Sequence, residues 1–172
     1  FALASENKGG KRTAGEWADA QGFVAVINAG MFATDHLTNV GLLLDGAHQN
    51  NRAWHPQYQS VLAFGPRKPG LPAAVMLDLD QPGAREAAAD YRQVVQNLRL
   101  LKGQGENVWK AQERQWSEAA VAADASGRIL FLFARSPMSM PDFNARLNAL
   151  PLNVVRAMHV EGGPEASLSI RA

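Results

Sequence analysis

Two apolar runs joined by a short glycine turn constrain the fold of this chain more than any other feature. Residues 119–124 and 128–135 are rich in alanine, leucine and phenylalanine, and residues 125–127 between them read Ala-Ser-Gly. Two runs of strand length on either side of such a turn predict an antiparallel β-hairpin. The hairpin favours a fold in which antiparallel pairing contributes much of the structure.

Helices and further strands are predicted around this hairpin. Thr13 followed by Glu16 is a capping-box pattern, and Ser139-Met-Pro-Asp142 combines a cap, a first-turn proline and an acidic residue three positions on. Helices are therefore predicted over residues 13–21, 84–91 and 142–149. Strands are predicted from apolar or β-branched composition over residues 1–5, 23–27, 40–44, 60–64, 73–79, 154–160 and 168–170. Residues 94–101 suit a helix or a strand, and residues 49–59 and 102–115 are polar and irregular.

The fold class that follows from these elements is mixed α+β. We expect a strongly bent, largely antiparallel sheet of about six to nine strands with a few helices packed on it. A chain of 172 residues suits one domain of ordinary size, so the prediction is a single domain over residues 1–172.

Composition excludes several classes of function. The chain has 17 basic and 16 acidic residues and a net charge of +1, so no attraction to nucleic acid is expected. It has no cysteine, which removes thiol nucleophiles and cysteine-bound metal sites. No apolar run approaches the roughly 18 residues that a membrane-spanning helix needs. The chain begins at Phe1 and not at Met, so we expect its natural N-terminus to lie upstream and draw nothing from the missing signal peptide.

Two glycine-bearing turns at the ends of predicted strands are the candidate site. The strand over 23–27 runs into Asn28-Ala-Gly30, and the strand over 154–160 runs into Glu161-Gly162-Gly163-Pro-Glu165. Glycine lets the backbone approach a ligand, and the amides of such a turn can bind anionic oxygens. Two carboxylates on one turn suit either the cleavage of a glycosidic bond or the binding of a hard metal ion. His159, just before the second turn, lies within a strand pattern and is expected to be a packed side chain.

Five segments follow one another in a recognisable order along the chain. They are Val-Ile-Asn28-Ala-Gly30-Met-Phe32, then Val40-Gly41 with Asp45-Gly46, then Val94-Val-Gln96-Asn-Leu-Arg99-Leu, then Ala123-Asp124 with Gly127-Arg128, and last Glu161-Gly162-Gly163-Pro-Glu165-Ala-Ser167-Leu. Together they resemble the phosphodiester glycosidase domain family, over about residues 23–168 and with most similarity to its bacterial, exported branch. The chain departs from the lysosomal-tagging branch of the family in having glutamate, not aspartate, before the Gly-Gly pair and Pro164-Glu165 after it.

The resemblance implies hydrolysis of a sugar-1-phosphodiester or a related glycosidic bond. The substrate would be a carbohydrate or sugar phosphate in an envelope polysaccharide, a teichoic-acid-like polymer or a glycolipid, and the protein would be periplasmic or secreted. A phosphate is already a good leaving group, so the site needs mainly a carboxylate near the anomeric carbon and donors for the phosphate. Glu161 is the first candidate for that carboxylate, with Glu165 or Asp124 second. The candidates for binding the sugar or phosphate are Asn28, Gly30, Arg99, Arg128, Gly162, Gly163 and Ser167.

Two other interpretations stay open from the sequence. A non-catalytic envelope module that binds glycan or a protein partner is supported by the lack of an evident acid–base histidine. A divalent-metal enzyme would use Glu161, Glu165 and Asp124 as oxygen ligands for Ca²⁺ or Mg²⁺. The hydrolase interpretation expects side chains from four separate segments to face one cleft. These are Asn28, Arg99, Asp124 and Glu161.

Overall fold

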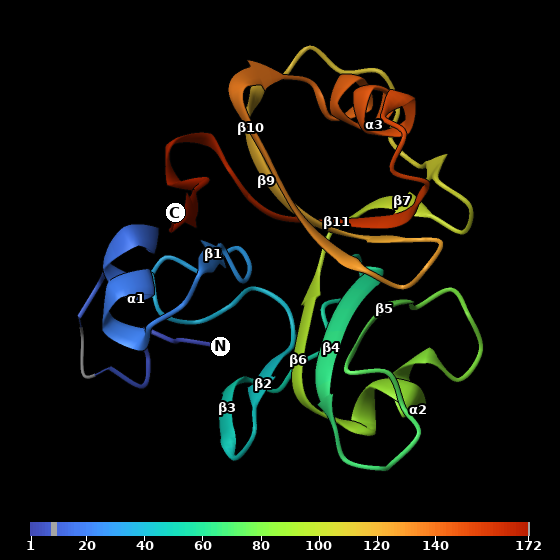
Figure 1. Ribbon diagram of the computed structural model, residues 1–172. Coiled ribbons are helices and arrows are strands. Elements are labelled where there is room, and N and C mark those ends of the chain that lie inside the picture. Colours follow the sequence, from blue (N-terminus) through green and yellow to red (C-terminus); the bar gives the residue numbers. More distant parts are fainter. Residues whose placement is uncertain (8–9, 172) are drawn as a thin grey trace.

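Two five-stranded sheets and one two-stranded sheet carry the fold in the described residues, 1–7 and 10–171. In the computed structural model the two larger sheets lie one above the other in the view of Figure 1, and the first helix lies beside them. All strand pairs are antiparallel. Three α-helices accompany twelve strands in this described part, which confirms the α+β class. The twelve strands exceed the six to nine expected because several are only two or three residues long, and they divide among three sheets.

The predicted hairpin is present and forms one side of the first sheet. In it, β9 (Trp116–Asp124) pairs with β10 (Ile129–Met138). On its other side β9 pairs with β11 (Val154–Gly162), which also pairs with β7 (Arg99–Lys102). The short strand β8 (Glu106–Asn107) completes the order β10-β9-β11-β7-β8. The hairpin therefore supports the strand that leads into the second glycine turn.

The second sheet has the strand order β3-β2-β6-β4-β5. Its strands are β2 (Leu43–Asp45), β3 (His48–Asn51), β4 (Ser60–Pro66), β5 (Ala74–Asp78) and β6 (Tyr91–Asn97). The segment that suited a helix or a strand is a strand on both sides of Leu98, where β6 ends and β7 begins. Leu98 thus connects the two sheets, and its carbonyl oxygen accepts a hydrogen bond from the His159 amide of β11 (2.9 Å).

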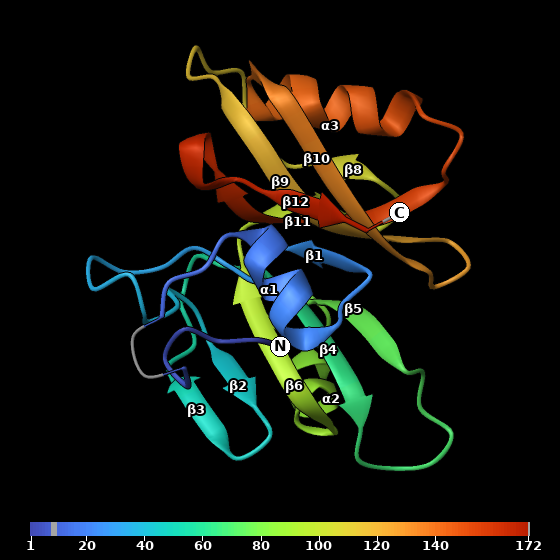
Figure 2. The same ribbon diagram turned by 60° about the vertical axis from the view of Figure 1, so that its left-hand side comes forward.

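The two-stranded sheet joins segments from opposite ends of the sequence. β1 (Ala25–Ile27) pairs with β12 (Leu168–Ile170), and the register sets Ile27 opposite Leu168. Helix α1 (Ala14–Gln21) packs against this pair, as Figure 2 shows. Because the first glycine turn follows Ile27 and the second precedes Leu168, this pairing brings the two turns together.

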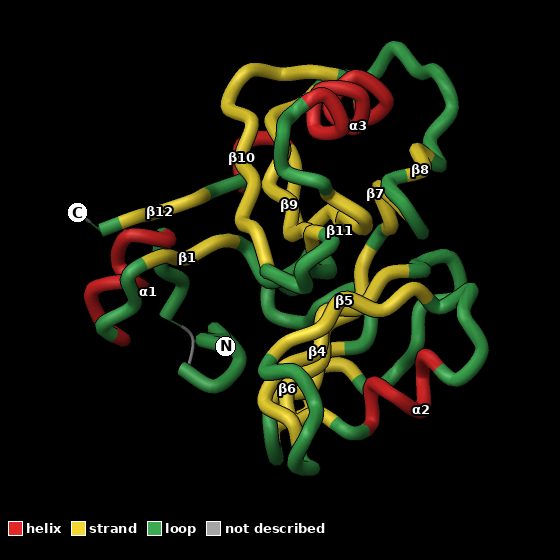
Figure 3. Tube along the Cα trace, turned by 45° about the vertical axis from the view of Figure 1, so that its right-hand side comes forward, coloured by secondary structure: helices red, strands yellow, loops and turns green. Residues whose placement is uncertain are grey.

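The helices begin where the sequence signals place them. Thr13 caps α1 with a complete capping box to Glu16, and Ser139 caps α3 (Met140–Ala149). Helix α2 (Ala84–Ala89) is confirmed but ends earlier than expected. Figure 3 shows α3 beside the first sheet and α2 beside the second. Within the described residues, no helix is long and apolar enough to cross a membrane.

Several local predictions differ from the structure, and the strand expected over 40–44 forms only over Leu43–Asp45. Residues 1–3 have no regular structure and residues 4–7 form a turn, in which the Glu6 amide donates to the carbonyl oxygen of Leu3 (3.1 Å). The side chain of Leu3 is buried in the core, so packing and not strand pairing explains why this residue is apolar. The polar composition of 49–59 predicts an irregular segment, but its first residues belong to β3, because the hairpin turn after β2 folds them back onto that strand. Residues 102–115 likewise contain the short strand β8.

Both faces of β9 are buried, which explains its nearly unbroken apolar sequence. Val121 and its alternate neighbours pack between the two large sheets. Ala120 faces the other way and packs under α3 with Phe143 and Leu147. Two buried acidic residues interrupt this apolar strand, Glu118 near its start and Asp124 at its end.

A buried glutamine ties the second sheet to the loop that precedes β4. Gln96 is fully buried. Its Oε1 accepts hydrogen bonds from the amides of His55 (2.8 Å) and Leu42 (3.2 Å). Its Nε2 donates to the carbonyl oxygens of His55 (2.9 Å) and Tyr58 (2.6 Å). The side-chain amide thus uses both donors and both lone pairs of its oxygen to hold this loop.

Gln96→Leu should lower the free energy of unfolding by about 3 kcal/mol or more. Leucine keeps the volume but leaves several buried backbone groups unpaired, each at a cost of roughly 1–3 kcal/mol. Urea denaturation measures the loss, and Gln59→Leu, on a less buried glutamine, is the matched control. A loss below about 1 kcal/mol would show that the loop does not depend on these bonds.

Candidate functional site

The Asn28 side chain joins the two glycine turns. Its Oδ1 accepts hydrogen bonds from the amide (2.7 Å) and the hydroxyl (3.2 Å) of Ser167. Its Nδ2 donates to the carbonyl oxygen of Glu165 (3.1 Å). The pairing of β1 with β12 places these groups in reach, because Ile27 lies opposite Leu168. The two turns expected from the sequence are therefore joined directly by hydrogen bonds.

Glu161 lies near the end of β11 and is only 9% exposed. Its Oε1 accepts a hydrogen bond from the amide of Gly162 (3.0 Å). Burial raises the pKa of Glu161, although that hydrogen bond and the charge of His159 oppose the change. The charges of Glu165 and Glu118 raise this pKa further. A carboxyl with a raised pKa at the end of a rigid strand is a candidate for catalysis.

The two glycines of the second turn are required for different reasons. Gly163 has a φ of 74°, in the left-handed region that favours glycine. Gly162 has an extended backbone, but an added Cβ would lie 2.6 Å from Cδ1 of Trp116 and 3.2 Å from Cε1 of His159. Close packing, and not backbone conformation, therefore demands glycine at the first position. Ser117 holds the second one, because its hydroxyl donates to the carbonyl oxygen of Gly163 (2.6 Å).

The first turn is also closely packed, here against side-chain amides. A Cβ added at Gly30 would collide with Oδ1 of Asn39 and lie 3.1 Å from Nδ2 of Asn97. Asn39 is buried, and its Oδ1 has no hydrogen-bond partner among the described residues. Burial, and then the charge of Glu161, raise the pKa of Tyr58, so these two side chains lie within electrostatic reach. The surroundings of the turns are thus rich in amide and acidic groups.

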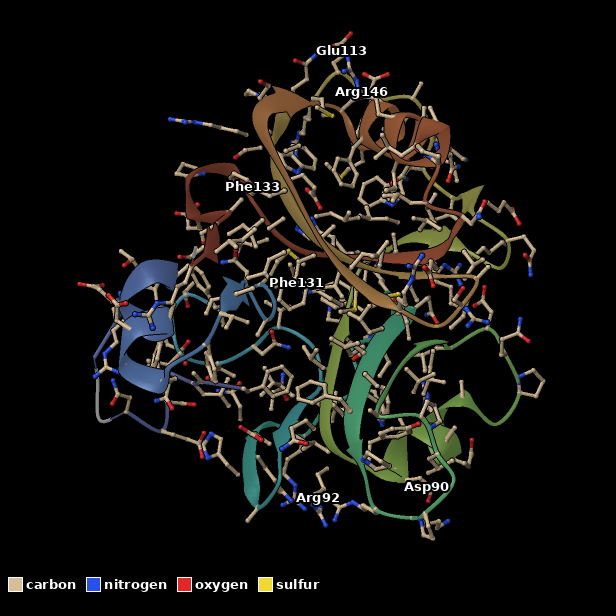
Figure 4. The ribbon with its side chains drawn as sticks, viewed as in Figure 1. Asp90, Arg92, Glu113, Phe131, Phe133 and Arg146 are labelled. Atoms are coloured by element: carbon tan, nitrogen blue, oxygen red, sulfur yellow. The ribbon has the colours of Figure 1, made fainter. Side chains whose placement is uncertain are left out.

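A cavity of about 420 Å³ opens beside the first turn. Asn28, Asn39 and Ser167 contribute polar groups to its lining. Phe131 of β10 contributes to the larger, apolar part, and Figure 4 labels it together with the neighbouring exposed Phe133. Glu161 does not line this cavity, but it begins the turn that ends at Ser167.

The other residues predicted for the site have partners elsewhere. Arg99 is held by two carboxylates, at 2.5 Å from Asp78 and 2.6 Å from Asp80. Nε of Arg128 lies 2.6 Å from Asp124 at the turn of the β9–β10 hairpin. Asp124 also accepts hydrogen bonds from backbone amides of that turn. These groups are engaged in holding local structure.

The strand register separates Asp124 from the joined turns. Glu161 pairs with Ala119, and Asp124 lies five residues further along β9. At about 3.3 Å per residue this is a separation of roughly 16 Å. The structure therefore does not place Asp124 in one cleft with Glu161, nor assemble the metal-ligand set of Glu161, Glu165 and Asp124. Among the described residues, no three acidic or histidine side chains gather in a way that could hold a metal ion.

Sequence analysis did not identify Glu118, the buried acidic partner of His159. Glu118 is fully buried, and its Oε1 lies 2.6 Å from Nδ1 of His159. Its Oε2 accepts a hydrogen bond from Nε1 of Trp116 (3.1 Å). His159 is packed as expected, but as one half of this pair. The available signal was a single charged residue inside an apolar strand, since a buried charge requires a partner.

The raised pKa of Glu161 predicts that Glu161→Gln gains stability relative to the wild type as pH rises. A carboxyl whose pKa is higher in the folded state stabilises the protein below its unfolded pKa, and this contribution is lost as pH rises through the folded value. Glutamine stays neutral throughout, so the two proteins should be similarly stable at about pH 4 and the variant more stable at about pH 8. Chemical denaturation over this range measures the difference. Parallel pH profiles for the two proteins would contradict the raised pKa.

The phosphodiester glycosidase family matches residues 21–171. No curated protein matches the sequence.

Several solved structures share the fold, among them the following two. One is the catalytic domain of zebrafish N-acetylglucosamine-1-phosphodiester alpha-N-acetylglucosaminidase, auto-inhibited by its pro-peptide, with a TM-score of 0.64 and 16% identity. The likeness covers 86% of this chain and 53% of that one. The other is a hypothetical protein from Synechocystis, with a TM-score of 0.61 and 15% identity over 94% of this chain and 50% of that one. The chain thus spans about half the length of either structure.

Proposed function

Because this chain belongs to the phosphodiester glycosidase family, we propose that its joined turns hydrolyse a sugar-1-phosphodiester or a related glycosidic bond. The observation that carries the proposal is the hydrogen-bonded junction between Asn28 and the turn that begins at Glu161. The junction connects the side-chain amide of Asn28 and the hydroxyl of Ser167 to the turn that begins at the buried Glu161. Groups of this kind can bind sugar oxygens and stabilise positive charge on a sugar ring.

Glu161 is the group proposed to act at the anomeric carbon. Glycosidic cleavage passes through a transition state with positive charge on the sugar, which a nearby carboxylate stabilises or attacks. The strand β11 fixes the backbone of Glu161, and the Gly162 amide holds one oxygen of its carboxyl. Since burial raises the pKa of Glu161, the fraction in the active carboxylate form should grow as pH rises above the usual range for glutamate.

The turns, and not the arginines, are proposed to contact the sugar and phosphate oxygens. Arg99 and Arg128 are already paired with carboxylates, which offset the positive charge that would attract a phosphate. The side-chain amide of Asn28 has two hydrogens. One is donated to the carbonyl oxygen of Glu165, so the other can be donated to a substrate oxygen. The hydroxyl oxygen of Ser167 can accept a hydrogen bond while it donates to Asn28.

We place this reaction in the bacterial envelope, in the periplasm or outside the cell. Sugar phosphodiesters there belong to polysaccharides, teichoic-acid-like polymers and glycolipids. The support is the resemblance of the segment from Glu161 to Ser167 to the exported bacterial members of the family. The net charge of +1 is consistent with a carbohydrate substrate, because it provides no general attraction to nucleic acid.

Glu161→Gln should lower kcat on a chromogenic sugar-1-phosphodiester by at least ~100-fold, because the shape is kept while the charge is lost. Glu86→Gln changes an exposed glutamate on α2 in the same way and should keep full activity. Steady-state kinetics of both variants and the wild type measure the effect.

Other outcomes of this assay distinguish the competing interpretations. Full activity of Glu161→Gln would contradict a catalytic role for this residue. A wild type that is inactive on all sugar-1-phosphodiesters but binds glycan would favour the non-catalytic module. Activity that is lost with a chelator and restored by Ca²⁺ or Mg²⁺ would show a metal requirement.

A further inference from the structure

A buried polar network lies directly beside the turn that carries Glu161. Glu118 and His159 come from the paired strands β9 and β11, and the register sets Glu118 opposite Gly162. The Glu118 carboxyl contacts Nδ1 of His159 (2.6 Å) through one oxygen and Nε1 of Trp116 (3.1 Å) through the other. When Nδ1 carries the hydrogen, both oxygens of the carboxylate accept a hydrogen bond. Glu118 therefore fixes the orientation of two rings at once.

Stability alone does not account for this network. Replacing a buried charged pair by well-packed apolar residues is often neutral or stabilising, because the charges no longer have to leave water. Glu118 is 0% exposed and His159 is 5% exposed. The neighbouring positions on the same face of β9 are alanines packed under α3. Since apolar side chains suit this environment, the contacts of the Glu118–His159 pair indicate its role.

The network touches the turn at Gly162. An added Cβ there would lie 2.6 Å from Cδ1 and 2.8 Å from Nε1 of Trp116, and 3.2 Å from Cε1 of His159. The α-carbon of Gly162 thus rests against the two rings that Glu118 orients. Ser117, which lies between Trp116 and Glu118 in the sequence, donates a hydrogen bond to the carbonyl oxygen of Gly163 (2.6 Å). A shift of either ring would therefore displace the turn.

We propose that Trp116, Glu118 and His159 are positioning residues for Glu161. Glu118 orients the rings, the rings seat Gly162, and the Gly162 amide holds the carboxyl of Glu161 (3.0 Å). The inference rests on the proposed function, because the position of Glu161 affects turnover only if Glu161 takes part in hydrolysis.

Glu118→Ala removes both hydrogen bonds and should lower kcat by at least about tenfold, since misplacing a catalytic group by ~1 Å can cost up to ~100-fold. KM should change less than kcat, because Asn28, a proposed sugar contact, lies on the first turn and has no contact with the network. Glu118→Gln is the matched variant. Its amide can accept from Trp116 and donate to Nδ1 of His159, so kcat should stay within about threefold of the wild type. Thermal unfolding establishes that both variants are folded.

NMR provides a readout that does not depend on turnover. The amide resonances of Gly162 and Gly163 should move in Glu118→Ala and stay near their wild-type positions in Glu118→Gln. The nitrogen shifts of His159 should show that its hydrogen moves from Nδ1 to Nε2 in Glu118→Gln, because Nδ1 must then accept. If the wild type proves inactive, the proposed function fails while the glycine resonances still test the positioning of the turn.

Gly162→Ala tests the same contact if Glu118→Ala does not fold. The extended backbone at this position permits alanine, but its Cβ collides with Trp116, so kcat should fall in the same way. A folded Glu118→Ala or Gly162→Ala variant with wild-type kcat, or with unmoved Gly163 resonances, would overturn the proposal. A folded Glu118→Gln variant as impaired as Glu118→Ala would also overturn it, because charge and not the hydrogen-bonded contact would then be required.

Discussion

The hydrogen bonds of the Asn28 side chain are the interaction on which the site depends. They connect a turn near the start of the sequence to Glu165 and Ser167 near its end. The strand pair beside them is only three residues long on each side, so its ladder alone is a short one. Each such bond contributes about 1 kcal/mol net, but its geometry decides which groups of the two turns meet. A site assembled from distant segments needs this kind of specific contact.

The second turn is held in a different way, by the pairing of β11 with the buried strand β9. This pairing places two acidic side chains, Glu118 and Glu161, in the buried part of the sheet. Their burial raises the pKa of both, with His159 opposing the change at each of them. Polar groups that break the local pattern of a core are expected at functional sites, where a loss of stability accompanies activity. Glu118 and Glu161 both lie where β9 meets the second turn.

How far the sequence predicts this structure depends on the range of the interaction. Local signals were sufficient for the hairpin, the capped helices and the two glycine turns, because each depends on neighbouring residues. Register was not readable from the sequence, so Asp124 was grouped with Glu161 although it stabilises a hairpin turn at the far end of β9. For the same reason the partner of His159 could not be named. Arg99 was expected to bind phosphate, because the sequence does not show that the fold brings Asp78 and Asp80 next to its guanidinium.

The central claim is that one substrate contacts both glycine turns at once. A crystal structure of the Glu161→Gln protein with a bound sugar-1-phosphodiester tests it most directly. The account predicts that the anomeric carbon lies next to residue 161 and that the amide of Asn28 contacts an oxygen of the same molecule. A substrate bound only in another recess, such as the one lined by Trp109 and Lys110, would contradict it.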